Sequence, residues 1–312
     1  MKATVTSGGG LFGPTSITWR IHTEPLALPA VLRAFQLQAL HPRTIRGIAQ
    51  NCLLDDPEVA RERLRRQLAY LTVRTFGTRE QAEQAAERVR RVHARLIGLD
   101  TDTGTLFRVD DEENLRWVHC VETSSHLEVA LRAGVPLTGA EADAYVAEQR
   151  RSASLVGLRD VPGDVPELRD YLEGMRPYLS ATDEARDALR RSLSPQLSLR
   201  ILCLWSRSHG APLVTQAAAL RPKLAAPLLT APLALGSLPA AGALAFATLP
   251  EWAKEMYGCH AGKATEYAAG TALKALRVAA AALPDRLVAP EIRAARGLMR
   301  ALAGAPGADV AA

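Results

Sequence analysis

Two histidines lie inside arginine-containing segments whose pattern is helical, at 88–96 and at 115–119 of the chain. The first segment centres on His93 and the second ends at His119. Neutral imidazole is a common nitrogen ligand of transition metals and of heme iron. Each histidine is therefore a candidate ligand of a buried metal or heme iron.

His93 shares one helical face with Arg90, one turn before it, and with an apolar residue one turn after it. On the preceding predicted helix, Arg63 and Gln67 are four residues apart and lie above one another, with Arg66 beside them. A buried arginine needs an anionic partner, and the carboxylates of a cofactor would provide one. The alternative stays open at this point: surface ion pairs of these arginines with the glutamates at 58, 62 and 87.

A second constellation follows His119. The spacing of His119, Glu122 and His126 places all three on one face of a helix, as in the metal sites of helical bundles. A non-heme metal site built from these residues is one hypothesis, although no second helix offers a matching Glu-x-x-His pattern. Structural histidines on a buried face are the other interpretation.

The elements that must position these residues are almost all helices. Capping residues, prolines at first turns and glycines at ends predict helices over 28–40, 57–76, 79–98, 110–132, 138–155, up to 175, 183–193, 196–206, 212–220 and from 250 into the C-terminal segment. The His41-Pro42 pair suits the start of a further helix. A hairpin is expected around Gly104. The class is all-α, with a flexible segment at 1–26, a single helical domain over 27–312, and a subdomain boundary near 159–166.

Composition limits the function classes. The 312 residues are 48% hydrophobic with a net charge of +5, and the arginines alternate with acidic residues, which argues against a nucleic-acid partner. The four cysteines form no metal-binding or disulfide pattern, and no apolar leader is visible, so a reducing cytoplasmic location is expected. Residues 224–250 carry no charge, but repeated prolines favour a buried helix pair or a membrane-surface segment over a transmembrane span.

The order of these motifs resembles an oxygenase family. The motifs are His41-Pro42, Asp56-Pro57 leading to Arg63–Leu68, Phe76-Gly77, Arg90–Arg95, Asp110-Asp111, Leu115–His119 and Leu137-Thr138. The family includes the latex-clearing rubber oxygenases and the fungal mycophenolic-acid pathway oxygenase, and the similarity covers about residues 28–177. It implies a globin-like helical bundle around a b-type heme, with His93 as the axial ligand of the iron.

The resemblance also implies roles for neighbouring residues. Arg63 and Arg90 are expected to hold heme propionates or brace the pocket. Arg66 and Gln67 stand where the rubber oxygenases have a lysine and a threonine on the distal side, so both depart from the family. Both are expected to be catalytic residues that hydrogen-bond the distal ligand of the iron. His119 is expected to act as a pocket base or to support the site.

The function so implied is a heme-b-dependent oxygenase or oxidase that uses dioxygen or peroxide on an apolar or aromatic small molecule, of the kind handled in secondary metabolism. Glu122 and His126 stand where the family tends to have apolar residues, which keeps the non-heme metal site as a rival. A non-oxygenative heme enzyme, a heme-binding protein and a helical scaffold without cofactor are the remaining alternatives.

Overall fold

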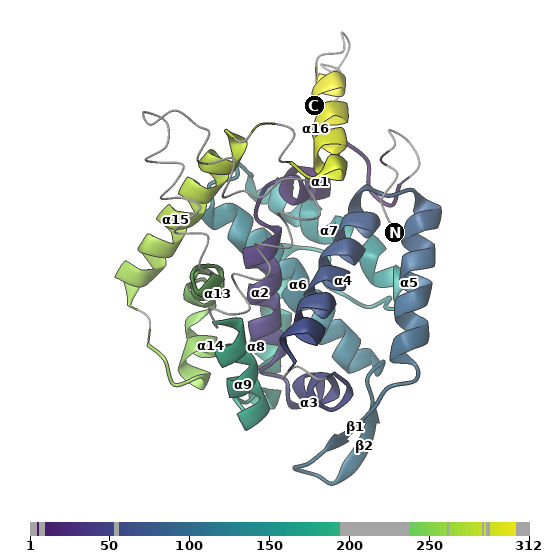
Figure 1. Cartoon of the computed structure of the whole chain (residues 1–312), viewed down its shortest axis with the longest axis vertical. Coiled ribbons are helices and arrows are strands. Elements are labelled where there is room, and N and C mark those ends of the chain that lie inside the picture. The colour runs from purple at the N-terminus through teal and green to yellow at the C-terminus, as the bar shows by residue number, and fades with distance from the viewer. Residues whose placement is uncertain are drawn as a thin grey trace.

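The computed structural model describes residues 5, 10–52, 56–193, 238–260, 262–282, 284 and 288–303. Within these ranges the chain is helical apart from one two-stranded hairpin, so the predicted all-α class is confirmed (Figure 1). The first half of the chain contains α1 (Ile17–His22), α2 (Ala27–Gln38), α3 (Pro42–Asn51), α4 (Pro57–Phe76), α5 (Arg79–His93), β1 (Ile97–Asp100), β2 (Thr105–Arg108) and α6 (Glu112–Arg132).

The second half continues the helical architecture, and several expected boundaries are confirmed. It contains α7 (Gly139–Leu155), α8 (Val165–Met175), a 3-10 turn (Arg176–Tyr178), α9 (Asp183–Ser192), α13 (Leu238–Ala247), α14 (Glu251–Met256), α15 (Lys263–Ala281) and α16 (Pro290–Ala303). The helices expected at 196–206 and 212–220 lie outside the described residues. In the uncharged stretch, residues 238–247 form α13 and residues 248–249 follow it. No helix among the described residues has the length and apolar character to cross a bilayer.

The segment expected to be flexible at 1–26 contains ordered structure from Gly10 onward. Gly10 forms an isolated bridge with Thr78, and Ser16 caps α1 by accepting a hydrogen bond from the Trp19 amide. Trp19 is buried against Phe76 and donates its indole N–H to the Thr75 carbonyl at 2.9 Å. Burial of this aromatic side chain fixes the segment to α4, so the expectation of flexibility does not hold there.

Helices α2 and α6 form the centre of the molecule, and α4 lies across them (Figure 1). Arg33 on α2 donates to the Ser125 hydroxyl at 2.8 Å, while the Trp117 indole, two turns earlier on α6, donates to the Gln38 carbonyl near the end of α2. Because the later residue of α2 contacts the earlier residue of α6, the two helices run antiparallel. Their shared core contains fully buried Trp117 and Leu37.

Local sequence signals explain the helices that flank the site. Asp56 caps α4 and Gly77 ends it, and Thr78 with Gln81 forms the predicted capping box of α5. Helix α5 ends at His93, so its predicted extension to residue 98 is wrong. Residues 97–100 instead pair with 105–108, and the turn places Gly104 at φ 69°, where glycine avoids the strain of a side chain.

Candidate active site

A cavity of about 210 Å³ lies among α2, α4 and α6, with contributions from α3, α5, α9 and the residue after β2. Its apolar lining consists of Val31, Leu32, Ala34, Phe35, Ile48, Ala60, Leu64, Val109, Leu115 and Val118. Its polar lining consists of Gln38, Arg43, Thr44, Arg63, Gln67, His93, Asn114, Glu122, Arg191 and Ser192. Apolar groups supply most of the cavity's surface, and ten polar or charged residues also contribute to its lining.

His93 is the last residue of α5, and its side chain reaches the cavity wall. Burial lowers the pKa of its imidazole, and the nearby positive charge of Arg63 lowers it further, whereas Asp110 acts in the opposite direction. The ring is therefore neutral at pH 7, which is the form that ligates a metal.

Arg63 and Gln67 line the same cavity from α4, one helical turn apart, as their spacing predicts. Among the described residues no carboxylate forms an ion pair with Arg63. The structure thus brings together three of the sequence-predicted site residues: His93, Arg63 and Gln67.

Arg66 and Arg90 lie elsewhere. The Arg66 side chain is 75% exposed and pairs with Glu62 at 2.9 Å, because it projects from the solvent side of α4. Arg90 pairs with Glu87 at 2.5 Å and donates to the Leu155 carbonyl, so it joins α5 to the end of α7. Neither side chain lines the cavity. Arg66 and Arg90 therefore form ion pairs with glutamates on their own helices, as the alternative interpretation of the sequence expected.

His119 lies next to the cavity but does not line it. Burial lowers the pKa of its imidazole to about 4, with Glu122 opposing and Arg74 adding to that shift. His119 is therefore a neutral residue that does not contribute to the cavity lining.

Glu122, one turn beyond His119, does line the cavity, and it is bound from behind by a residue that sequence reasoning missed. Arg74 on α4 donates from Nη2 to the Glu122 Oε1 at 2.5 Å, and both side chains are buried. Its position could have identified Arg74 as a site residue. It lies between Val73 and Phe76, which are buried, and an arginine in such a place needs an internal partner.

A polar network continues behind this pair. The His22 ring lies 4.7 Å from the His126 ring, centroid to centroid, and its nitrogens are 2.9 Å from the Thr75 hydroxyl and 3.1 Å from the Tyr145 hydroxyl. Burial lowers the pKa of His126 to about 4. His126 Nε2 is buried with no hydrogen-bond partner among the described residues. These histidines are neutral groups of the interior.

The three residues of the hypothetical non-heme metal site do not converge. Among the described residues, only Glu251, Glu255 and His260 form a group of three or more metal-ligating side chains whose ligand atoms all lie within 4.8 Å of one another. His119, Glu122 and His126 share a helical face, but Arg74 takes up the carboxylate and the ligand atoms remain too far apart. The structure therefore does not bring these three side chains together as a ligand set, and the non-heme site stays a prediction.

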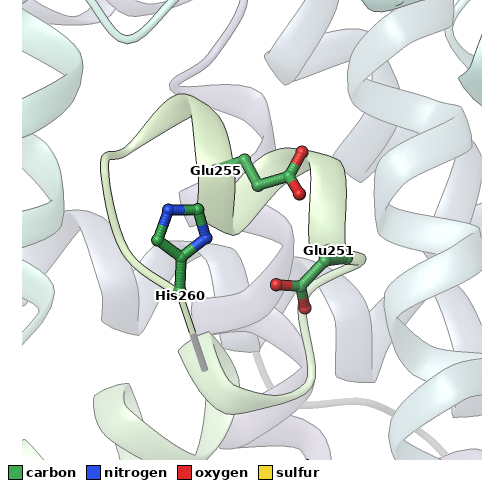
Figure 2. A group of neighbouring side chains, drawn as sticks. All are labelled: Glu251, Glu255 and His260. Atoms are coloured by element: carbon green, nitrogen blue, oxygen red, sulfur yellow. The ribbon is translucent and has the colours of Figure 1, made fainter. Parts of the chain in front are cut away.

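The Glu251 and Glu255 side chains of α14 lie close to the His260 side chain, which comes from the segment that follows this helix (Figure 2). All three are exposed, and none lines the cavity. Glu251 Oε2 lies 2.8 Å from Nζ of the buried Lys254, so the lysine partly compensates the negative charge of Glu251. Exposed acidic groups of this kind are common on protein surfaces, so the cavity remains the candidate active site.

The mainly helical described chain thus encloses a cavity with a neutral histidine and an arginine in its wall. In the family comparison, residues 19–283 match the model described as ER-bound oxygenase mpaB/B'/Rubber oxygenase, catalytic domain. The chain therefore belongs to this family, as its motif order indicated, and the match supports an oxidoreductase activity of the oxygenase type. Comparisons with curated proteins and with solved structures give no significant match.

Proposed function

We propose that this protein is a heme-b-dependent oxygenase that acts on an apolar or aromatic small molecule, with His93 as the axial ligand of the iron. The observation that carries the proposal is the position of His93. Its neutral imidazole reaches the wall of an apolar cavity, where Arg63 supplies a positive charge beside it.

The residues of the cavity fit a b-type heme in their chemistry. His93 offers a neutral nitrogen, Arg63 offers a guanidinium to a propionate, and Gln67 offers an amide beside it. The free volume of about 210 Å³ is below the roughly 300 Å³ at the lower end of ligand pockets. Heme insertion therefore requires side chains of the wall to move apart.

A bound heme would supply the iron that activates dioxygen or peroxide. The protein's own residues then have three tasks. The apolar side chains of α2, α4 and α6 bind the substrate and exclude water. Gln67 donates or accepts a hydrogen bond inside the cavity, and Arg63 compensates negative charge there. Arg66 and Arg90, from their positions, support helix surfaces.

Replacing His93 by Ala tests the proposal directly. The purified chain should show a Soret band after titration with hemin, and His93→Ala should abolish that band while its circular dichroism stays unchanged. His260→Ala removes an exposed histidine outside the cavity and is the matched control, expected to bind heme as the unmodified chain does. Full heme occupancy with an unaltered spectrum in His93→Ala would contradict the assigned ligand.

Activity is the second readout. With heme bound, consumption of dioxygen or peroxide in the presence of apolar and aromatic compounds should depend on His93. Turnover of a substrate under strict anaerobiosis and without peroxide would instead favour a non-oxygenative heme enzyme.

A further inference from the structure

Among the described residues, Glu122 is the one acidic side chain in the lining of the cavity. Its Oε1 accepts the hydrogen bond from Arg74, and its Oε2 has no hydrogen-bond donor among the described residues. The side chain is 11% exposed, and the cavity is the space that it lines. Arg74 therefore fixes one oxygen of this carboxylate, and no described donor occupies the other oxygen of a side chain that lines the cavity.

The charge of Glu122 is maintained although the residue is buried. Burial alone would raise the pKa of its carboxyl group, but the positive charge of Arg74 and its hydrogen bond to Glu122 lower that pKa. The net result is a lowered pKa and a carboxylate at neutral pH.

Glu122 is buried among two kinds of neighbour: the polar residues Arg74, His119 and His126, and apolar residues of the cavity wall. Val118 lies one turn before it on α6, and Val31 and Leu32 line the cavity from α2, which packs against α6. In such surroundings a carboxylate oxygen without a donor is costly, and a ligand that supplies a donor recovers that cost. A ligand carboxylate placed there would meet repulsion instead.

We propose that Glu122 is a specificity-determining residue that binds a hydrogen-bond-donating group, a hydroxyl or an ammonium, on an otherwise apolar substrate. Arg74 is its positioning residue. The inference rests on the proposed function in one respect, namely that the cavity is the substrate site. It requires neither heme nor His93.

A matched series of probes tests it in the whole chain: 4-phenylbutylamine, 4-phenylbutanol and 4-phenylbutyrate, each titrated calorimetrically at neutral pH. The amine and the alcohol should bind more tightly than the acid. Glu122→Gln should weaken amine binding by roughly 10- to 100-fold, the range expected for a hydrogen bond to a charged group, and should bring amine and acid affinities together.

Glu128→Gln is the control variant. Glu128 also lies on α6 and also pairs with an arginine, Arg132 at 2.5 Å, but it is outside the cavity. This variant should bind all three probes as the unmodified chain does. A Glu122→Gln protein that keeps the original amine-to-acid ratio would overturn the proposal, and so would tightest binding of the acid by the unmodified chain.

Glu122→Gln leaves Arg74 buried without its counter-ion, so the single variant could fail to fold. The double variant Arg74→Met with Glu122→Gln removes both charges and should show the same loss of discrimination. Hemin titration of each sample separates the two proposals. Discrimination without a Soret band would refute only the heme proposal, whereas a Soret band without discrimination would refute only the role of Glu122.

Discussion

The α4 and α6 walls of the cavity carry opposite charges that are held in different ways. On α6, the Glu122 carboxylate is bonded at 2.5 Å to a buried arginine behind the wall. On α4, the Arg63 guanidinium lines the same cavity with no carboxylate partner among the described residues. Arg74, the partner of Glu122, lies on α4 itself, three turns beyond Arg63.

The difference indicates two kinds of site. A charge with an internal counter-ion is oriented before any ligand arrives, which suits recognition of a donor group. A charge without one is compensated by what binds, which suits a cofactor that brings its own carboxylates. The first arrangement contributes to folding and binding together, and the second to binding alone.

The largest expected effect therefore follows loss of the buried counter-ion. Arg74→Met leaves the Glu122 carboxylate buried and unpaired, and should lower the free energy of unfolding by about 3–5 kcal/mol. Urea denaturation at neutral pH measures it. The double variant with Glu122→Gln should recover most of this loss, since it removes the second charge. Equal destabilisation in the single and double variants would show that the two residues are not coupled.

The buried histidines behind the α6 wall predict a smaller effect that depends on pH. The pKa of His126 is lowered to about 4 in the folded chain, from an ordinary value of 6.5. Between these values the unfolded state binds more protons than the folded state, so stability falls as the pH falls from 6.5 towards 4. At the acid end of that range, His126 lowers the free energy of unfolding by about 3 kcal/mol.

His126→Leu should flatten this part of the stability profile. The substitution removes the imidazole that stays neutral in the folded chain. It breaks no hydrogen bond of Nε2, which has no partner among the described residues. His260→Gln, at the surface, should leave the profile unchanged. Denaturation series at several pH values between 4 and 7 give the comparison. An unchanged slope in His126→Leu would mean that His126 is protonated in the fold.

The sequence predicted the α4 wall well, for a local reason. Asp56, Pro57 and Gly77 define the ends of one helix, and a spacing of four places Arg63 and Gln67 on one face of it. Spacing could not decide which of the adjacent arginines faces inward. The resemblance suggested Arg66 as well, but that side chain lies about 60° from Arg63 and about 100° from Gln67 around the helix axis. It pairs with Glu62.

The α6 wall was harder to predict, because its arrangement depends on contacts far apart in the chain. His119, Glu122 and His126 have the spacing of metal ligands, and nothing nearby in sequence shows that Arg74, 48 residues away, bonds Glu122. The position of His22 beside His126 depends on α1, in a segment expected to be flexible. Local patterns define helices, whereas the partners of buried charges come from tertiary packing.

The smallest expected effect compares Arg63 with Arg66 on the same helix. Arg63→Met should change the free energy of unfolding by no more than about 0.5 kcal/mol, because no described ion pair is lost. It should weaken heme binding by roughly tenfold, the equivalent of about 1.4 kcal/mol, because a propionate loses its cation. Arg66→Met removes a surface pair worth about 0.3–0.5 kcal/mol and should leave heme affinity unchanged. Hemin titrations and urea denaturation on both variants measure the contrast. Equal heme affinities in the two variants would show that Arg63 is not the residue that compensates the cofactor, and that the α4 wall owes its positive charge to another role.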